Sequence, residues 1–392
     1  MVTQGRVIAA AILATLVAAL GEQAAVAATP AAGRTSAAGF ESQGTPKERA
    51  AARHRAAARR KATARKQAKA KAATQEIPVS FTVRNTNTSM VPCAADGRTY
   101  EVRGHLVGPA GRLSTATPQA VTLYVHGLGY GEFFWNYKGV PGYDYAAQQA
   151  AQFGQVSVII DRLGYGASGR PDGNQVCYGS EADYLNQIVT HLRSGGYSAS
   201  GAPAGRRFGK VALAGHSAAG FMVEASAAGY RNVDALLVLA SSNAPSGVAL
   251  YSAFAQTALD CSTAPLPGNY AFFGKTPADF KAAHFFNADP AVADAVTAQR
   301  APDPCMDTGS APQAIVTNVL ADNTVKVPVL IVNGADDALF PPPDGDVEKQ
   351  LFLGNPDVTQ VTLPATGHAV TLGRTAPQFR SVVGRWLQQR GF

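Results

Sequence analysis

Long apolar runs are missing from almost all of the 392-residue sequence. The one clear run, residues 7–20, has fourteen residues, fewer than the ~20 that a helix needs to span a bilayer. No later stretch is both long and apolar enough to cross a membrane. We therefore expect no transmembrane segment in the mature chain.

The N-terminus has the pattern of an export signal. Arg6 supplies a positive charge ahead of the apolar run, and the Ala-Val-Ala at 25–27 suits cleavage beside small residues. A membrane anchor is the alternative interpretation, for which the run is short. We expect residues 1–28 to be a cleaved signal peptide and the mature protein to be secreted.

Cysteine is also scarce. The four cysteines show no Cys-x-x-Cys or clustered Cys/His spacing, which argues against a zinc site. An even number in an exported chain favours disulfides, although free buried thiols are the alternative. Three pairings are possible, and we expect Cys93 with Cys177. We expect Cys261 with Cys305, because both lie in one inserted segment described below.

Charge is unevenly distributed along the chain. The formal net charge is +7, yet residues 47–71 carry eleven Lys or Arg against one Glu. The first 46 residues are neutral overall, so residues 72–392 carry a net charge of −3. The basic character of the protein therefore belongs to a tail.

The tail, residues 29–76, is rich in Ala, Lys and Arg and poor in aromatic residues, so it lacks the side chains to build a core. We expect a disordered linker or a pro-segment that is later clipped. Contact of the arm 47–71 with an anionic cell surface is the second interpretation. No nucleic-acid-binding module accompanies the arm, and no nucleic acid partner is expected.

From residue 77 onward, short β-rich runs alternate with helical patterns. The first two runs alternate polar and apolar residues, as in an antiparallel edge pair, whereas several later ones are continuously apolar, as in parallel strands. The alternation predicts an α/β fold with a mostly parallel central sheet flanked by helices, over residues 77–392. The expected strands are 77–85, 99–109, 120–127, 155–161, 210–217, 235–242, 327–334 and 358–364. The expected helices are 143–154, 180–196, 218–230 and 376–390.

One interval, residues 243–326, interrupts this rhythm. It lacks a strong strand signal and contains three helical patterns, at 276–286, 289–301 and 310–320. We expect a helical cap inserted into the α/β domain.

Ser217 is the candidate nucleophile. It lies between the strand 210–217 and the helix 218–230, with Gly215 two residues before it and Ala219 two residues after it. A sharp strand-to-helix turn raises a serine above the sheet edge and requires small neighbours. A serine hydroxyl also needs a nearby base, and the pattern alone is common in a chain rich in Ala and Gly.

Two backbone N–H groups are candidates for an oxyanion hole. Acyl transfer places negative charge on a carbonyl oxygen, which fixed donors stabilise. Ala218 follows the candidate nucleophile, and Leu128 lies in the Gly-rich turn after the strand 120–127. We expect His126, at the start of this turn, to shape the loop and not to act as the base.

His368 is the candidate base among seven histidines, because it follows a strand and Gly367 lets the backbone present the ring. His284 is the reserve candidate. A carboxylate should orient the base, and two aspartates follow the strand 327–334. The run GADDALFP best fits Asp337, with Asp336 as the alternative.

These stretches resemble the α/β-hydrolase superfamily, through YVHGLGYGEFFW, LAGHSAAG, LIVNGADDALFP and ATGHAVTLGRTAPQF, which organise residue 119 to the C-terminus. The resemblance implies a capped serine hydrolase with the triad Ser217–His368–Asp337 and the oxyanion donors Leu128 and Ala218. Ala219 departs from the family's usual glycine.

A serine at this place predicts an acyl-enzyme, whereas relatives that dehalogenate or open epoxides carry aspartate there. We expect a small-molecule carboxylic ester as substrate, because an alkoxide leaves more readily than an amine. An acyltransferase or a peptidase/amidase with the same triad is the alternative. Neither a metal nor an organic cofactor is expected. Tyr130, Phe134 and Trp135 are candidates for the substrate pocket, or for contacts that hold the cap on the core.

Overall fold

The structure, a computed structural model, describes residues 53, 73–115, 117–201 and 205–392. The signal peptide expected at 1–28 and nearly all of the linker expected at 29–76 lie outside the described residues. The first strand, β1 (Thr74–Arg84), begins before the domain boundary expected at 77. The features below all belong to one compact unit, Arg60–Phe392.

A central sheet has the strand order β11-β10-β7-β6-β3-β4-β2-β1-β5. Neighbours from β11 to β4 run parallel, whereas β2 is antiparallel to both β4 and β1. The mostly parallel sheet and its eight expected strands are confirmed, and the short β5 is additional. Besides β1, the strands are β2 (Thr99–Pro109), β3 (Gln119–Val125), β4 (Ser157–Ile160), β5 (Ser198–Ala199), β6 (Phe208–His216), β7 (Ala235–Leu239), β10 (Val329–Gly334) and β11 (Val358–Leu363).

The two kinds of strand follow from their sequences. In β1 every second residue faces the core, so Val79 and Phe81 are buried, and Phe81 lies opposite Val102 of β2. In β7 all five residues are buried, as expected for a strand covered on both faces. The sheet therefore needs helices on both sides.

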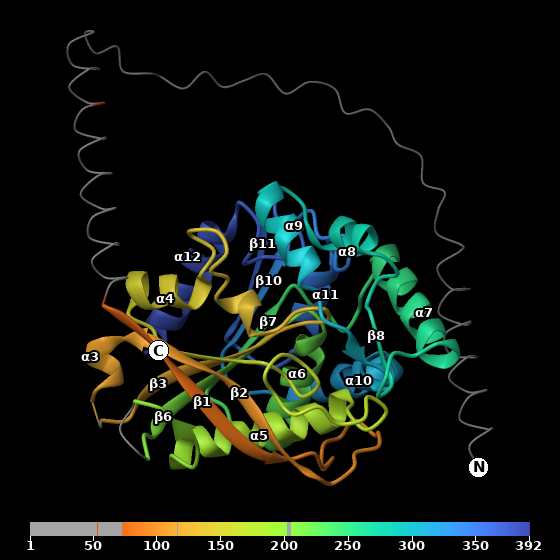
Figure 1. Ribbon diagram of the computed structural model, residues 1–392. Helices are drawn as coiled ribbons and strands as arrows, with labels where there is room; N and C mark the ends of the chain where they lie inside the picture. The colour runs from red at the N-terminus through yellow and green to blue at the C-terminus, as the bar shows by residue number, and fades with distance from the viewer. Residues whose placement is uncertain (1–52, 54–72, 116, 202–204) are drawn as a thin grey trace. The chain divides into compact units, whose positions relative to one another are not determined.

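Helices supply these two layers (Figure 1). α5 (Tyr178–Ser194) and α6 (Ala218–Tyr230) pack into one apolar cluster, and α4 (Tyr145–Phe153) and α12 (Ala376–Gln389) pack into a second. All four expected helices are present, and α6 has the expected bounds. In the part of the chain that the structure describes, no helix combines the length and the apolarity that crossing a membrane requires.

Three shorter elements accompany them: α3 (Ala110–Leu113), the 3-10 helix η1 (Glu132–Trp135) and α11 (Asp344–Leu351). The sequence analysis missed α11, because DGDVEKQL is too polar to show an apolar helical face. α11 packs beside β10 and β11, and it follows the segment that carries Asp337.

The inserted segment forms four helices, and Figure 1 shows them grouped at one side of the domain. Three of them match the expected patterns, whereas α7 was not expected, and neither was the short pair of strands β8 and β9. A 3-10 helix, η2 (Asp322–Thr324), leads back to the sheet. The elements are α7 (Val248–Thr263), β8 (Tyr270–Ala271), α8 (Pro277–His284), α9 (Pro290–Ala298), β9 (Asp303–Pro304) and α10 (Cys305–Ala321).

Both expected disulfides are confirmed. Cys93 bonds Cys177, which joins the loop after β1 to the start of α5. Cys261 bonds Cys305, which joins the last turn of α7 to the start of α10. The helix start expected at Ser180 is wrong: Ser180 lies in the first turn of α5, where its Oγ accepts the N–H of Cys177.

Candidate active site

Ser217 lies in the turn between β6 and α6, with φ of 56° and ψ of −126°. A residue other than glycine rarely adopts a positive φ, because its Cβ then crowds the backbone. Such strain is typical of a nucleophile raised on a sharp strand-to-helix turn. The N–H of Ser217 donates to Leu239 O at 2.9 Å, which ties this turn to the end of β7.

The small residues around Ser217 have separate steric reasons. A Cβ on Gly215 would lie 2.3 Å from Ala219 O, and a Cβ on Gly220 would lie 2.3 Å from Ser241 Oγ. Glycine is therefore required at both positions. Ala219 itself is fully buried and its methyl group has a place in the core. The departure from the usual motif is a matter of packing.

His368 and Asp337 lie at the same edge of the sheet, after β11 and β10. His368 Nδ1 lies 2.9 Å from Asp337 Oδ2, and both side chains are buried. Asp337 Oδ1 accepts the N–H groups of Leu339 and Phe340, at 2.8 and 3.0 Å. The carboxylate is thus fixed by the backbone through one oxygen and contacts the imidazole through the other.

The second ring nitrogen, His368 Nε2, has no hydrogen-bond partner among the described residues. The ring packs 4.7 Å from that of His216, and His216 Nε2 lies 3.0 Å from His368 O. Because His216 directly precedes Ser217, these contacts hold the loop of His368 beside the turn. Asp336, the alternative acid, is exposed.

The Gly-rich turn after β3 packs against Ser217. A Cβ on Gly127 would lie 2.7 Å from Ser217 Cβ, so only glycine allows this approach. Leu128 follows in this turn, and Ala218 is the first residue of α6. Across the described ranges, no turn, cap or side-chain hydrogen bond is recorded from the N–H of Leu128 or Ala218. Both are free to meet an acceptor, and the N–H of Ala218 lies at the positive end of a helix.

Comparison with known proteins identifies the family that has this arrangement. The model of the alpha/beta hydrolase family matches residues 123–379, which is more than half of the chain. The chain belongs to the alpha/beta hydrolase family.

Solved structures confirm the fold of this alpha/beta hydrolase. A thermophilic esterase from Thermogutta terrifontis is 18% identical, with a TM-score of 0.55, over 80% of this chain and 100% of that chain. An enol-lactonase from Burkholderia xenovorans LB400 is 17% identical, with a TM-score of 0.54, over 76% and 99%. A monoacylglycerol lipase from Paleococcus ferrophilus is 17% identical, with a TM-score of 0.50, over 69% and 95%. No curated protein matches the sequence.

Asp303 is a residue of this hydrolase that the sequence analysis missed. Its Oδ1 accepts the N–H of Gly129 at 2.6 Å and the hydroxyl of Tyr165 at 2.7 Å, and its Oδ2 accepts the N–H of Phe273 at 3.0 Å. It therefore connects the turn of Leu128 to the inserted segment. Burial raises the pKa of Asp303 from 3.8 to about 6. No local motif marks it, because its partners are distant in sequence.

We predict that Asp303→Asn lowers stability by about 1–3 kcal/mol, because an amide N–H₂ would face the N–H of Phe273. The raised pKa of Asp303 also makes the stability of the wild type depend on pH, because the native state binds the Asp303 proton more tightly than the unfolded chain does. This contribution is fully present below pH 3.8 and is lost as pH rises through about 6. The difference in melting temperature between wild type and variant should therefore narrow from pH 4.5 to 7.5. Thermal unfolding measures it, and a constant or widening difference would contradict the prediction.

The other histidines near the site are held in structural contacts. His126 Nδ1 lies 2.8 Å from Gly127 O, and its Nε2 accepts the N–H of Arg162. His284 Nδ1 lies 3.1 Å from the hydroxyl of Tyr130. Burial, and then Arg162, lowers the pKa of His126 well below the usual value. Burial, and then His368, does the same for His284.

The three candidate pocket residues are all buried. Phe134 stacks on His216 with ring centroids 4.0 Å apart, and Trp135 packs on Phe134. Tyr130 contacts Phe280 of the inserted segment. Their role toward a substrate remains a prediction.

A hollow of about 360 Å³ lies between α7 and α8 and reaches Ala338, the neighbour of Asp337. Phe273 and Phe280 also line it. The inserted segment therefore supplies the walls of a cavity that extends toward the loop of Asp337.

Proposed function

We propose that the chain is a serine esterase that cleaves a carboxylic ester through an acyl-enzyme on Ser217, His368 and Asp337. The observation that carries this proposal is the 2.9 Å contact of His368 Nδ1 with Asp337, which leaves Nε2 unpartnered beside the strained turn of Ser217. The names of similar folds, an esterase, an enol-lactonase and a lipase, support ester chemistry.

In this proposal, Ser217 Oγ attacks the ester carbonyl carbon while His368 Nε2 takes the hydroxyl proton. Asp337 keeps the other proton on Nδ1 and stabilises the imidazolium that forms. The N–H groups of Leu128 and Ala218 receive the charge on the carbonyl oxygen. His368 then returns the proton to the departing alcohol. Water, activated by the same nitrogen, releases the acid and restores Ser217.

Access to the nucleophile is restricted. Ser217 is 7% exposed and His368 is 1% exposed. Ala369, the residue after His368, donates its N–H to His284 O of α8 at 2.9 Å. The inserted segment thus contacts the catalytic loop, and we propose that it caps the site and limits the size of the ester.

A fluorophosphonate probe tests the nucleophile directly. We expect covalent labelling of the wild type at Ser217, located by peptide mass spectrometry. A panel of p-nitrophenyl esters of increasing chain length, run beside aminopeptidase substrates and acyl acceptors, tests the reaction class. Ester hydrolysis should dominate. Faster amide cleavage or acyl transfer than ester hydrolysis would favour the peptidase/amidase or acyltransferase alternative. Absence of labelling at Ser217 would contradict the proposed triad.

We also propose that the mature chain is secreted after removal of residues 1–28. The two disulfides are consistent with an oxidising compartment. The basic arm 47–71 is then either a linker or a contact to an anionic cell surface.

A further inference from the structure

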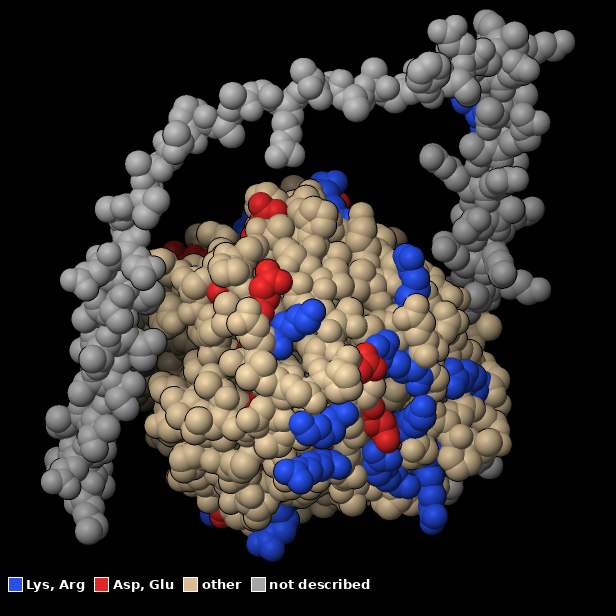
Figure 2. Space-filling view, turned by 180° about the vertical axis from the view of Figure 1, so that it is seen from behind, with Lys and Arg blue, Asp and Glu red and all other residues tan. Residues whose placement is uncertain are grey.

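Buried acids outnumber buried cations in the described part of the domain. Eleven Asp or Glu residues are buried there, against three Arg and no Lys. Figure 2 shows the complementary surface, where Lys and Arg are more numerous than Asp and Glu over the lower part of the visible face. A buried carboxylate needs hydrogen bonds or a positive partner, so each buried group of acids raises the question of its partner.

One buried group has its own cation. Arg162 contacts Glu181 at 2.8 Å and also pairs with Asp307, and all three side chains are fully buried. The guanidinium lies between two carboxylates and neutralises much of their charge. Arg162 Nη1 and Asp307 Oδ1 have no hydrogen-bond partner among the described residues, but the cation that balances the carboxylates is already present in this group.

A second group, Glu224, Asp322 and Glu348, has no such cation. One oxygen of each carboxyl lies within 4.8 Å of the other two, and all three residues are 0% exposed. Within the described ranges, no Lys or Arg forms an ion pair with any of them. Burial and the neighbouring carboxyls raise the pKa of Glu224, and burial with Glu348 raises that of Asp322.

Asn243 holds one oxygen of each carboxyl. Its Nδ2 donates to Glu224 Oε2 at 2.7 Å and to Asp322 Oδ2 at 3.4 Å, and its backbone N–H donates to Glu348 Oε2 at 2.5 Å. The amide of Asn318 donates to Asn243 Oδ1 at 3.1 Å and fixes this orientation.

The remaining oxygens are the unexplained part of the cluster. Glu224 Oε1 and Asp322 Oδ1 are fully buried and accept no hydrogen bond from an amide or hydroxyl group of the described chain. A hydrogen bond between the carboxyls of Glu224 and Glu348 also raises the pKa of Glu224. Glu348 Oε1 receives only a long contact of 3.3 Å from Asn243. Each carboxyl therefore has one oxygen positioned by Asn243 and one oxygen that receives at most a long contact from groups outside the three carboxyls. A carboxylate that binds a metal commonly uses one oxygen as the ligand, while its other oxygen accepts hydrogen bonds from neighbouring protein groups.

We propose that Glu224, Asp322 and Glu348 bind a structural calcium ion. A divalent cation would cancel two of the three negative charges and would satisfy the oxygens that Asn243 leaves free. The donors are all oxygen, which suits a hard cation and disfavours zinc or copper. Mg²⁺ demands near-ideal octahedral geometry and usually keeps several waters, whereas these carboxyls are fully buried, so the site suits Ca²⁺ better.

The three ligands join parts of the molecule that matter for the candidate active site. Glu224 lies on α6, which begins directly after Ser217, and Glu348 lies on α11, which follows the loop of Asp337. Asp322 lies where the inserted segment returns to the sheet. The ion would therefore tie together the helix of the nucleophile, the segment after the acid and the end of the cap.

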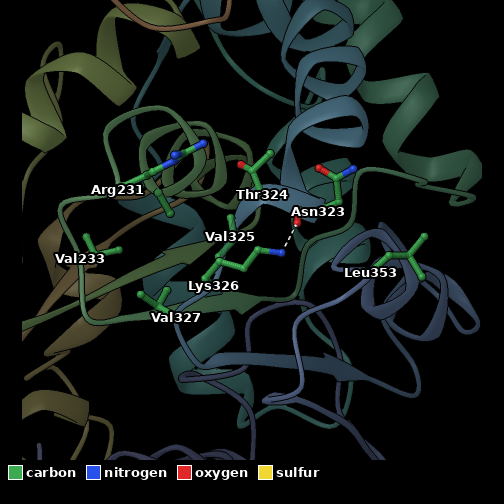
Figure 3. Close-up of a pocket in the computed structure, with 9 residues that line it drawn as sticks. Arg231, Val233, Asn323, Thr324, Val325, Lys326, Val327 and Leu353 are labelled. Atoms are coloured by element: carbon green, nitrogen blue, oxygen red, sulfur yellow. Dashed lines mark hydrogen bonds between the residues drawn. The ribbon is translucent and has the colours of Figure 1, made fainter.

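A hollow of about 490 Å³ is lined by residues close in sequence to two members of the cluster. Figure 3 shows the residues that line it. Its lining includes Ala227, one turn after Glu224 on α6, and Asn323, which follows Asp322. Lys326 lines the same hollow, but its Nζ donates to Asn323 O at 2.9 Å. This cation is therefore used locally and does not neutralise the cluster.

The proposal can be tested without measuring activity. The full-length protein is first treated with EDTA to remove bound metal and is then titrated with Ca²⁺. We expect one Ca²⁺ per chain by calorimetry and a melting temperature higher by about 5 °C at saturating Ca²⁺. Mg²⁺ should bind about tenfold more weakly or less. Glu224→Gln and Glu348→Gln should each weaken Ca²⁺ binding about tenfold or more.

Asp346→Asn is the matched control, because Asp346 is exposed on the same helix as Glu348. It should leave Ca²⁺ binding and the calcium-dependent rise in melting temperature unchanged. If the cluster variants do not fold, the comparison of wild type in EDTA and in Ca²⁺ still decides. A wild type that binds no Ca²⁺, or binding that survives in both Gln variants, overturns the proposal and leaves a cluster that shares protons.

Discussion

Ser217→Ala is expected to lower kcat/KM for a short p-nitrophenyl ester by about 10⁵-fold or more. The variant lacks the oxygen that attacks the ester carbonyl carbon in the proposed mechanism. The remaining groups still bind the ester and still offer the N–H groups of Leu128 and Ala218, so a small residual rate over water should persist. Steady-state kinetics on the wild type and the variant measures the effect.

Folding must be separated from chemistry in this comparison. Alanine keeps the Cβ at the same strained φ, so the melting temperature of Ser217→Ala should stay close to that of the wild type. Ser226→Ala removes a hydroxyl from the same helix, α6, and serves as the matched control. It should retain fluorophosphonate labelling and activity within a few-fold. Full ester hydrolysis by Ser217→Ala would refute the proposed nucleophile.

Asp337→Asn is expected to lower kcat by about 10⁴-fold. In the variant, the Asn oxygen would accept the N–H groups of Leu339 and Phe340, as Asp337 Oδ1 does. The amide N–H₂ would then face His368 Nδ1 and donate to it. That contact places the ring proton on Nε2, which is the nitrogen that must be free to accept the proton of Ser217.

The neighbouring aspartate supplies the control. Asp336 is exposed, and its backbone N–H, which donates to Thr366 O, is kept in Asp336→Asn. We expect Asp336→Asn to retain kcat within about two-fold, a surface change of little consequence. Equal losses in the two variants would show that the loop, and not the carboxylate of Asp337, determines the rate.

Much of the fold could be predicted because its signals are local. The strands of the sheet appear as short apolar or alternating runs, and α6 begins where the serine turn ends. α7 and α11 escaped prediction for a physical reason: α7 buries few of its residues, and α11 is largely polar. Neither shows the apolar stripe on which helix prediction depends. The strands β8 and β9 have two residues each and carry no periodicity at all.

The candidate site divides in the same way. Ser217, Asp337 and His368 each follow a parallel strand, so their position at one edge of the sheet was predictable from chain order. Asp303 and the cluster of Glu224, Asp322 and Glu348 were not predictable. They depend on contacts between residues that are 19 to 174 positions apart, as in the hydrogen bonds of Asn243 with Glu224 and of Gly129 with Asp303.

The disulfide between Cys261 and Cys305 restricts the conformations of the inserted segment. It closes residues 261–305, including α8 and α9, into a covalent ring. A ring of this kind limits how far α8 can separate from α7 and α10, even when this segment unfolds locally. Because His284 O of α8 accepts the N–H of Ala369, the disulfide also restricts how far the segment can move away from the loop of His368.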